Sequence, residues 1–198
     1  MEIILATGNV HKIREFRAIF RALPHFELIS LYDNATYIPP EETGKTFKEN
    51  AILKAMHAAE HFKKLVLADD SGLVVPALNG VPGVYSQRYA GPKATDVENR
   101  KKLLEEMRSL EDEQRAAYFE CCLVLADQSG VKKISEGIVE GKILSEEKGA
   151  HGFGYDPIFL KEGYQKTFAQ IDENVKNRIS HRYKAFERLL PYLEMLKS

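Results

Sequence analysis

Residues 2–6, Glu-Ile-Ile-Leu-Ala, are followed by Thr7-Gly8-Asn9 and then by a segment that begins Val10-His11-Lys12. Residues 2–6 contain a short apolar run, at positions 3–6, that stops at a turn, and this pattern predicts a buried β-strand over residues 2–6. After the turn, apolar residues recur from Ile13 to Leu23 at three- and four-residue spacing, as in a helix with one buried face. The chain therefore opens as strand, turn and helix.

The rest of the chain alternates short apolar runs with amphipathic helices. We expect strands near residues 27–31, at 65–68, 117–126 and 131–139, and just after residue 157. We expect further helices from about residue 46, over about 95–110, and from an N-cap at Ser180 to the end. The runs 117–126 and 131–139 look antiparallel, because only a short turn joins them. The pattern predicts an α/β fold with a mixed central sheet flanked by helices.

Composition narrows the functional class. The chain has 198 residues, 44% of them hydrophobic, which is ordinary for a globular protein with a real core. Its 28 basic and 29 acidic residues give a formal net charge of −1, so no basic excess is available to hold a nucleic-acid polymer. No repeat, low-complexity tract or linker divides the sequence, and we expect one domain over residues 1–198.

Targeting signals and cysteines add little chemistry. The amino-terminal apolar run has no basic region before it, and no stretch approaches the roughly 20 apolar residues that cross a bilayer, so we expect a cytoplasmic protein without membrane contact. Cys121 and Cys122 are adjacent in an apolar run, where they would point to opposite faces of a strand. We interpret both as small buried hydrophobic residues rather than as a disulfide or metal site.

The turn from Thr7 to Lys12 is the first candidate site. A turn between a strand and a helix presents backbone N–H groups and the positive end of the helix dipole, which favour an anion such as phosphate. Lys12 adds a charge, and Thr7 and Asn9 add donors. The segment lacks the Gly-Lys-Ser/Thr ending of a P-loop, and the alternative is a turn with no ligand.

Asp69-Asp70-Ser71 is the second candidate. Two adjacent carboxylates where a strand meets a loop repel one another unless a cation or proton lies between them, and Mg²⁺ is the natural cation for oxygen ligands. Glu41 and Glu42 precede the second helix and could complete such a site. The alternative is that these acidic residues are merely solvated.

Two further segments could contact the rest of a ligand. In the loop from Gly149 to Pro157, glycines allow close backbone approach, and Phe153 and Tyr155 offer flat faces for a base. Lys176 and Ser180-His181-Arg182, at the start of the last helix, offer donors for a carbonyl or phosphate. The alternatives are a surface loop with its aromatics in the core and a solvated helix end.

Taken together, these segments resemble the inosine triphosphate pyrophosphatase family, also called the non-standard purine NTP pyrophosphatases, along residues 2 to 196. The resemblance rests on six motifs in the family's order. They are Leu5-Ala6-Thr7-Gly8-Asn9 with Lys12; Glu41-Glu42-Thr43-Gly44 with Glu49-Asn50-Ala51 and Lys54; Ala68-Asp69-Asp70-Ser71-Gly72-Leu73; Pro82-Gly83-Val84-Tyr85-Ser86 with Arg88; Gly152-Phe153-Gly154-Tyr155-Asp156-Pro157; and Ile179-Ser180-His181-Arg182. The chain departs from many bacterial relatives at Ala150-His151, which precede the fifth motif.

The resemblance implies an enzyme that releases pyrophosphate from ITP, dITP and XTP with Mg²⁺, and a homodimer whose long mixed sheet carries two lobes with an active-site cleft between them. It implies that Asp70 is the catalytic base and that Asp70, Asp69 and Glu41 surround the metal. The substrate-binding residues that it implies are Thr7, Gly8, Asn9, Val10, His11, Lys12, Lys54, Ser71, Phe153, Gly154, Tyr155, Asp156, Lys176, His181 and Arg182.

Simple chemistry connects these residues to the reaction. Cleavage between the α- and β-phosphates needs a water in line with the leaving pyrophosphate and positive charge around the oxygens, which Lys12, Lys54 and Mg²⁺ would supply. Arg182 has only hydrogen-bond donors, so it would bind the 6-keto oxygen of a purine and disfavour the 6-amino group of adenine. The alternatives are a pyrophosphatase for pyrimidine or modified nucleotides, a nucleotide-binding regulatory module without turnover, and RNA binding, against which the neutral charge counts.

Overall fold

A computed structural model of the protein describes residues 1–31 and 37–196. The chain divides into two compact units, each assembled from separate segments. Unit 1 comprises Met1–Asp70, Cys121–Gly137 and Arg182–Ser198, and unit 2 comprises Ser71–Glu120 and Ile138–His181. The expectation of one domain over 1–198 stays a prediction, and it includes residues 32–36 and 197–198, which lie outside the described residues.

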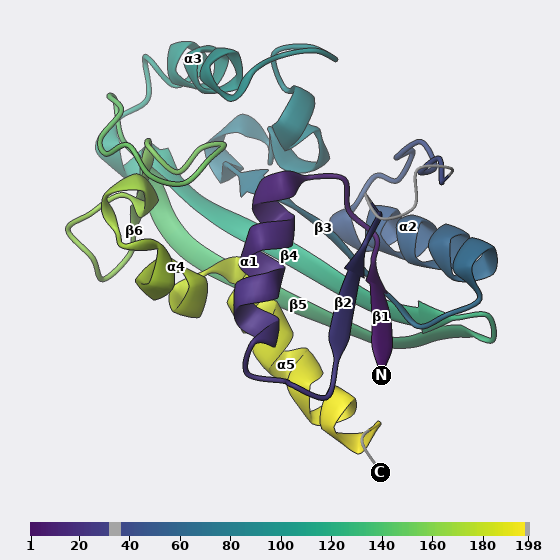
Figure 1. The fold of residues 1–198 in the computed structure, drawn as a ribbon. Coiled ribbons are helices and arrows are strands. Elements are labelled where there is room, and N and C mark those ends of the chain that lie inside the picture. Colours follow the sequence, from purple (N-terminus) through teal and green to yellow (C-terminus); the bar gives the residue numbers. More distant parts are fainter. Residues whose placement is uncertain (32–36, 197–198) are drawn as a thin grey trace. The chain divides into compact units, whose positions relative to one another are not determined.

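Strands and helices alternate over the first part of the chain, after which three consecutive strands precede the last two helices (Figure 1). The strands are β1 (Glu2–Leu5), β2 (Glu27–Ser30), β3 (Val66–Val74), β4 (Ala116–Asp127), β5 (Gly130–Ile143) and β6 (Phe159–Lys161). The helices are α1 (Val10–Phe20), α2 (Phe47–Phe62), α3 (Asp96–Glu106), α4 (Glu173–Ile179) and α5 (His181–Met195). Short 3-10 turns are η2 (Pro76–Leu78), η3 (Gly83–Arg88), η4 (Asp112–Arg115) and η5 (Phe168–Gln170).

The strands form a mixed sheet in the order β2-β1-β3-β4-β5-β6. β1 pairs in parallel with both β2 and β3, whereas β5 and β6 are antiparallel. β4 and β5 are neighbours joined by two residues, a connection too short for a parallel pair, so the expected antiparallel arrangement is confirmed. The predicted α/β fold with a mixed sheet is therefore confirmed.

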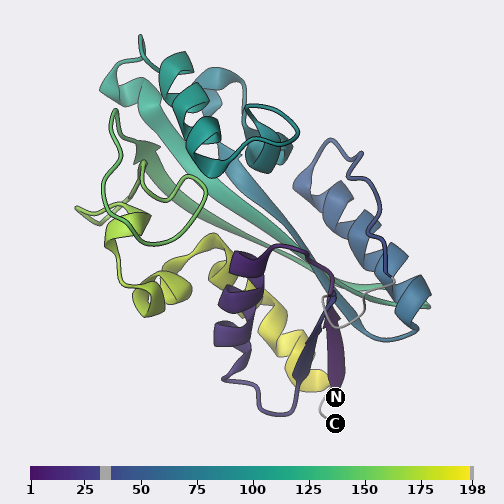
Figure 2. The same cartoon turned by 45° about the horizontal axis from the view of Figure 1, so that its top comes forward.

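In unit 1, helices cover both faces of the strands. Ile3 and Leu5 of β1 belong to a core cluster that also contains Phe16 of α1 and Leu189 of α5. Since side chains alternate along a strand, Ile4, which is 2% exposed, faces the other way. Figures 1 and 2 show α2 on that opposite face, away from α1 and α5. Burial of both faces explains why every residue of β1 after the exposed Glu2 is apolar.

The helix boundaries follow from capping chemistry. Thr46 caps α2 by accepting the Glu49 N–H at 3.1 Å, and the helix ends at Lys63, whose φ of 52° is left-handed. Thr95 and Glu98 form a reciprocal capping box that starts α3. The expected starts of both helices are confirmed to within one residue.

Two expected boundaries are wrong. The strand expected at 65–68 continues to Val74, so Asp69 and Asp70 lie within β3 rather than where it meets a loop. Aspartate disfavours strands, but β3 lies between two neighbours in the sheet, and that pairing overrides local propensity. Lys176 lies in a separate short helix, α4, because Asp172 caps a new helical turn before the chain straightens at Ser180.

Unit 2 has its own core. Phe119, Phe159 and Phe168 pack on one another with ring centroids 4.7 to 5.9 Å apart, and Leu103 and Met107 of α3 belong to the same cluster. Arg115 donates to the carbonyls of Met107, Ile143 and Leu144, which ties the end of α3 to the end of β5. No helix within residues 1–31 and 37–196 combines the length and apolarity that a bilayer crossing requires.

Candidate active site

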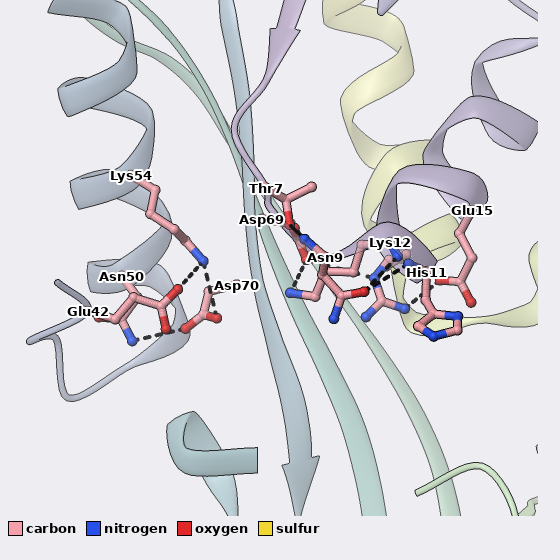
Figure 3. A network of polar contacts seen from close by, with 11 residues as sticks. Thr7, Asn9, His11, Lys12, Glu15, Glu42, Asn50, Lys54, Asp69 and Asp70 are labelled. Atoms are coloured by element: carbon pink, nitrogen blue, oxygen red, sulfur yellow. Dashed lines mark hydrogen bonds and ion pairs between the residues drawn. The ribbon is translucent and has the colours of Figure 1, made fainter. Parts of the chain in front are cut away.

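In unit 1, the difference in length between two neighbouring strands places Asp69 and Asp70 beside the Thr7–Lys12 turn. β1 pairs with β3 only as far as Leu67, and the Ala6 N–H donates to the Leu67 carbonyl at 2.8 Å. β1 then turns away into α1 while β3 continues through the two aspartates. Figure 3 shows the resulting network, with Asp69 near α1 and Asp70 near α2.

Asp69 is a fully buried counter-ion. Its Oδ2 lies 2.7 Å from Lys12 Nζ and 3.8 Å from Arg182 Nε. Burial raises the pKa of this carboxyl, but Lys12 and Arg182 lower it more, so the net pKa lies below the ordinary aspartate value. Asp69 is therefore held as an anion between two cations.

Asp70 has a different environment. Its Oδ1 lies 3.5 Å from Lys54 Nζ, and its Oδ2 accepts a hydrogen bond from Asn50 Nδ2 at 3.0 Å (Figure 3). Burial raises the pKa of Asp70, Lys54 lowers it, and Glu42 raises it again, so that the net pKa is raised. Adjacent carboxylates with pKa values displaced in opposite directions are typical of sites that divide charge and proton transfer between them.

Lys54 connects Asp70 to the loop before α2. Its Nζ lies 2.6 Å from Glu42 Oε1, and its side chain is only 11% exposed. Burial lowers the pKa of Lys54, but Asp70, Asp69 and Glu42 together raise it above its ordinary value. Lys54 is therefore a protonated cation at neutral pH, as a phosphate ligand must be.

Asn50 was missed as a site residue, although it lies inside the Glu49-Asn50-Ala51 motif. It is completely buried, its Oδ1 accepts the Gly44 N–H at 2.7 Å, and its Nδ2 therefore faces Asp70. A Cβ at Gly44 would lie 2.6 Å from Asn50 Oδ1, so only glycine fits there. A fully buried amide in a helix next to a lysine one turn later was the signal available in the sequence.

The metal site expected from Asp70, Asp69 and Glu41 stays a prediction. Glu41 is exposed, and it is Glu42 that shares Lys54 with Asp70. Within the described part of the chain, no three His, Cys, Asp or Glu side chains converge on one point. Mg²⁺ usually takes one or two carboxylates and completes its shell with water and substrate phosphates, so the Asp70–Glu42 pair fits it chemically.

The Thr7–Lys12 turn is organised by Asn9. Its side-chain oxygen accepts the N–H groups of His11 at 2.9 Å and Lys12 at 3.2 Å, which caps α1. Thr7 Oγ1 accepts the Asn9 N–H at 3.3 Å. Val10 is exposed, and Gly8 lies in the same turn with open space where a side chain would be. The turn is thus pre-formed, with Lys12 pointing at Asp69 (Figure 3).

The candidate base-binding residues of unit 2 form a separate network. Asp156 Oδ2 accepts from Lys176 Nζ at 2.5 Å and from the Phe153 N–H at 2.9 Å. Lys176 Nζ also lies 4.9 Å from the centre of the Phe153 ring. A Cβ at Gly152 would overlap Asp156 Oδ2, so glycine is required there. Phe153, which is half-buried, is therefore the flat face of this loop that a ligand can reach.

The remaining candidates are more deeply placed. Tyr155 is 4% exposed, and its hydroxyl donates to the Ser86 carbonyl, so its ring is part of the core. His181, 3% exposed, stacks on Phe119 with centroids 4.9 Å apart. In unit 1, Arg182 NH1 lies 2.5 Å from Glu15 Oε2. Ser71 is half-buried, directly after Asp70.

Comparison with known proteins identifies the family of the chain. The family model described as the Ham1 family matches residues 3–192. A dITP/XTP pyrophosphatase from Protochlamydia amoebophila is 60% identical over 198 residues, covering all of both chains. One from Chlamydia abortus is 48% identical, covering 99% of this chain and 96% of its own.

Solved structures of Ham1 proteins also match the chain over almost its whole length. The Staphylococcus aureus Ham1 protein matches with a TM-score of 0.88 and 42% identity, covering 98% of each chain. A HAM1 protein from Coxiella burnetii matches with a TM-score of 0.89 and 43% identity, covering 98% of this chain and 99% of its own. These matches extend over helices α1 and α2, which carry Lys12 and Lys54, and over β3, which carries the two aspartates, and the chain belongs to the Ham1 family.

Proposed function

We propose that the protein hydrolyses the non-standard purine nucleoside triphosphates dITP, XTP and ITP to the monophosphate and pyrophosphate, which removes them before incorporation into DNA or RNA. The chain is a nucleoside-triphosphate pyrophosphatase, as its close relatives are named. The observation that carries the proposal is the pair of adjacent buried aspartates whose pKa values are displaced in opposite directions, each beside its own lysine.

The triphosphate is assigned to unit 1. Lys12 and Lys54 are both largely buried cations held by carboxylates, and a phosphate chain would replace part of those contacts with its own oxygens. Thr7, Gly8, Asn9, Val10 and His11 form the turn that presents donors at the start of α1. These residues neutralise the charge that develops on the leaving pyrophosphate.

Asp70 acts as the catalytic base in this proposal. Its raised pKa makes it a better proton acceptor than an ordinary aspartate, and Asn50 fixes the direction of its carboxylate. It takes a proton from the water that attacks the α-phosphorus. Mg²⁺, held by Asp70 with Glu42 and assisted by the more distant Asp69 and Glu41, would polarise the phosphate oxygens and lower the pKa of bound water.

Base recognition is assigned to Phe153, Gly154, Tyr155 and Asp156 with Lys176, His181 and Arg182, and the sugar-phosphate junction to Ser71. Phe153 offers a face for stacking, and Lys176, fixed by Asp156, offers donors to a keto oxygen. A donor that meets the 6-amino group of adenine loses about 1–3 kcal/mol per unmade bond, which favours hypoxanthine and xanthine. We further propose that the protein works in the cytoplasm as a homodimer.

One assay tests the proposal. Pyrophosphate release is measured from ITP, XTP, GTP, ATP and dUTP, each with Mg²⁺ and with the metal chelated. We expect release from ITP and XTP that exceeds release from ATP and needs the metal. Preference for dUTP would favour the pyrimidine alternative, and tight ITP binding without pyrophosphate release would identify a regulatory module instead.

A further inference from the structure

In the loop from Gly149 to Pro157, which is proposed to bind the base, no neighbouring side chain in the described part of the chain packs against Gly154 to fix its backbone. Its φ of 58° is left-handed, which glycine adopts without strain, and no atom lies within 4 Å of the place a Cβ would take. On one side of it, Tyr155 is anchored in the core by its ring and by its hydroxyl bond to Ser86. On the other side lies the half-buried Phe153. The Phe153 N–H is held by Asp156, so the direction of Phe153 depends on that bond together with whatever fixes the two peptide groups of Gly154.

Helix α3 fixes both of these groups. Asp96 Oδ2 accepts the Gly154 N–H at 2.7 Å, and Arg100 NH1 donates to the Gly154 carbonyl at 2.8 Å. Residues four apart lie on the same face of a helix, so Asp96 and Arg100 face the loop together. One bond holds the peptide plane before Gly154, and the other holds the plane after it.

Arg100 is itself locked in place. Its Nε and NH2 make a two-point contact with Glu147, at 2.9 and 3.0 Å, and its side chain is only 9% exposed. This fork geometry leaves NH1 directed at Gly154, an arrangement that a lysine cannot reproduce. Asp96 is the first residue of α3, and the capping box of Thr95 and Glu98 fixes where that helix begins.

We propose that Asp96 and Arg100 are positioning residues that set base preference by fixing Gly154 and hence the direction of Phe153. This inference rests on the proposed role of the Phe153–Asp156 segment in binding the purine. Loss of either contact loosens the loop without touching Lys12, Lys54 or Asp70. The affinity for the base and the discrimination between bases should therefore fall more than the turnover of bound substrate.

The test compares Asp96→Ala, Arg100→Met and Arg100→Lys in the full chain. Binding of IMP and AMP is measured by calorimetry, and kcat and KM are measured for ITP and ATP. We expect Arg100→Met and Asp96→Ala to weaken IMP binding by about tenfold and to raise KM for ITP by a similar factor. The preference for ITP over ATP should decrease, and kcat should change less than KM. Arg100→Lys should recover part of the loss.

Two variants of α3 provide controls. Asn99→Ala removes two buried hydrogen bonds from the same helix, to the Gln87 carbonyl and from the Ala90 N–H, without touching the loop. Asn99→Ala should lower the melting temperature and leave the ratio of IMP affinity to AMP affinity unchanged. Glu105→Gln, at an exposed position, should change neither.

The outcomes separate two failures. If the wild type releases no pyrophosphate but binds IMP over AMP, and Asp96→Ala abolishes that preference, the positioning role stands and the pyrophosphatase role falls. The positioning role is overturned if the wild type is active but Asp96→Ala and Arg100→Met keep its ratio of IMP affinity to AMP affinity. It is also overturned if Asn99→Ala changes that ratio as much as they do. A wild type that binds IMP and AMP equally also overturns it. Because Asp96 is exposed, its variant should fold even if Arg100→Met does not.

Discussion

Lys12 Nζ lies 2.7 Å from Oδ2 of Asp69, a carboxylate with no exposed surface. The next residue along the strand, Asp70, lies instead beside Lys54 and Asn50. Because successive side chains of a strand point to opposite faces, the two aspartates serve different partners despite being adjacent. Their substitutions should therefore have different consequences.

Asp70→Asn should keep the fold and remove most turnover. The asparagine retains the shape of the carboxylate, and the loss of a general base typically lowers kcat by about 10²–10⁴-fold. Asp69→Asn should instead destabilise the protein by roughly 3–5 kcal/mol, because it leaves the buried Lys12 without its counter-charge. Urea unfolding and steady-state kinetics on both variants test this. Near-normal kcat in Asp70→Asn would remove Asp70 from the chemistry.

The pH dependence of activity should reflect the raised pKa of Asp70. A base must be ionised to act, so activity should be lost as the pH falls through the pKa of this carboxyl. Because that pKa is raised before a cation binds, the acid limb of kcat/KM at low Mg²⁺ concentration should lie above the value of about 3.9 for an unperturbed aspartate, and saturating Mg²⁺ should move it down in pH. Lys54 lowers the pKa of Asp70, so Lys54→Met should move the limb further up in pH. An acid limb that stays in place in Lys54→Met would contradict this assignment.

Gly44→Ala tests the support of Asp70 by Asn50. The added methyl carbon would lie 2.6 Å from Asn50 Oδ1, so the amide must turn and its bond to Asp70 must weaken. We expect kcat to fall by about tenfold, since a hydrogen bond to a charged group contributes roughly 1.5–3 kcal/mol. Asn50→Ala should give a similar loss. Lys48→Ala, at an exposed position of the same helix, controls for a general effect of substitution in α2.

Elements with strong local signals could be predicted from the sequence, and the pairing of charges could not. The turn of residues 7–12 and the helix starts near Thr46 and Thr95 depend on neighbours within four residues, and they were predicted correctly. The extension of β3 through Asp69 depends on strands that are remote in sequence. The choice of Glu42 over Glu41 beside Lys54 depends on how a loop approaches α2. Both required the folded structure.

Local reasoning identified Lys176, His181 and Arg182 only as possible donors near the start of the last helix, and the family resemblance implied that they bind the substrate. The structure supplies reasons of a different kind. Lys176 is fixed by Asp156, and Arg182 by Glu15. The expectation that Arg182 reads the purine directly stays a prediction, since the guanidinium is almost wholly buried between two carboxylates.

The ion pair between Glu15 and Arg182 allows that expectation to be tested. Arg182→Ala alone should destabilise the protein by roughly 3–5 kcal/mol, because it strips Glu15 of a partner 2.5 Å away in a buried site. A lowered ITP/ATP preference in that variant would therefore be ambiguous. Glu15→Gln with Arg182→Met removes both charges and should recover much of the stability, and the coupling between the two changes should be measured by a double-mutant cycle. If the recovered double variant still prefers ITP over ATP as strongly as the wild type, Arg182 serves the packing of unit 1, and base readout belongs to Lys176 and Phe153.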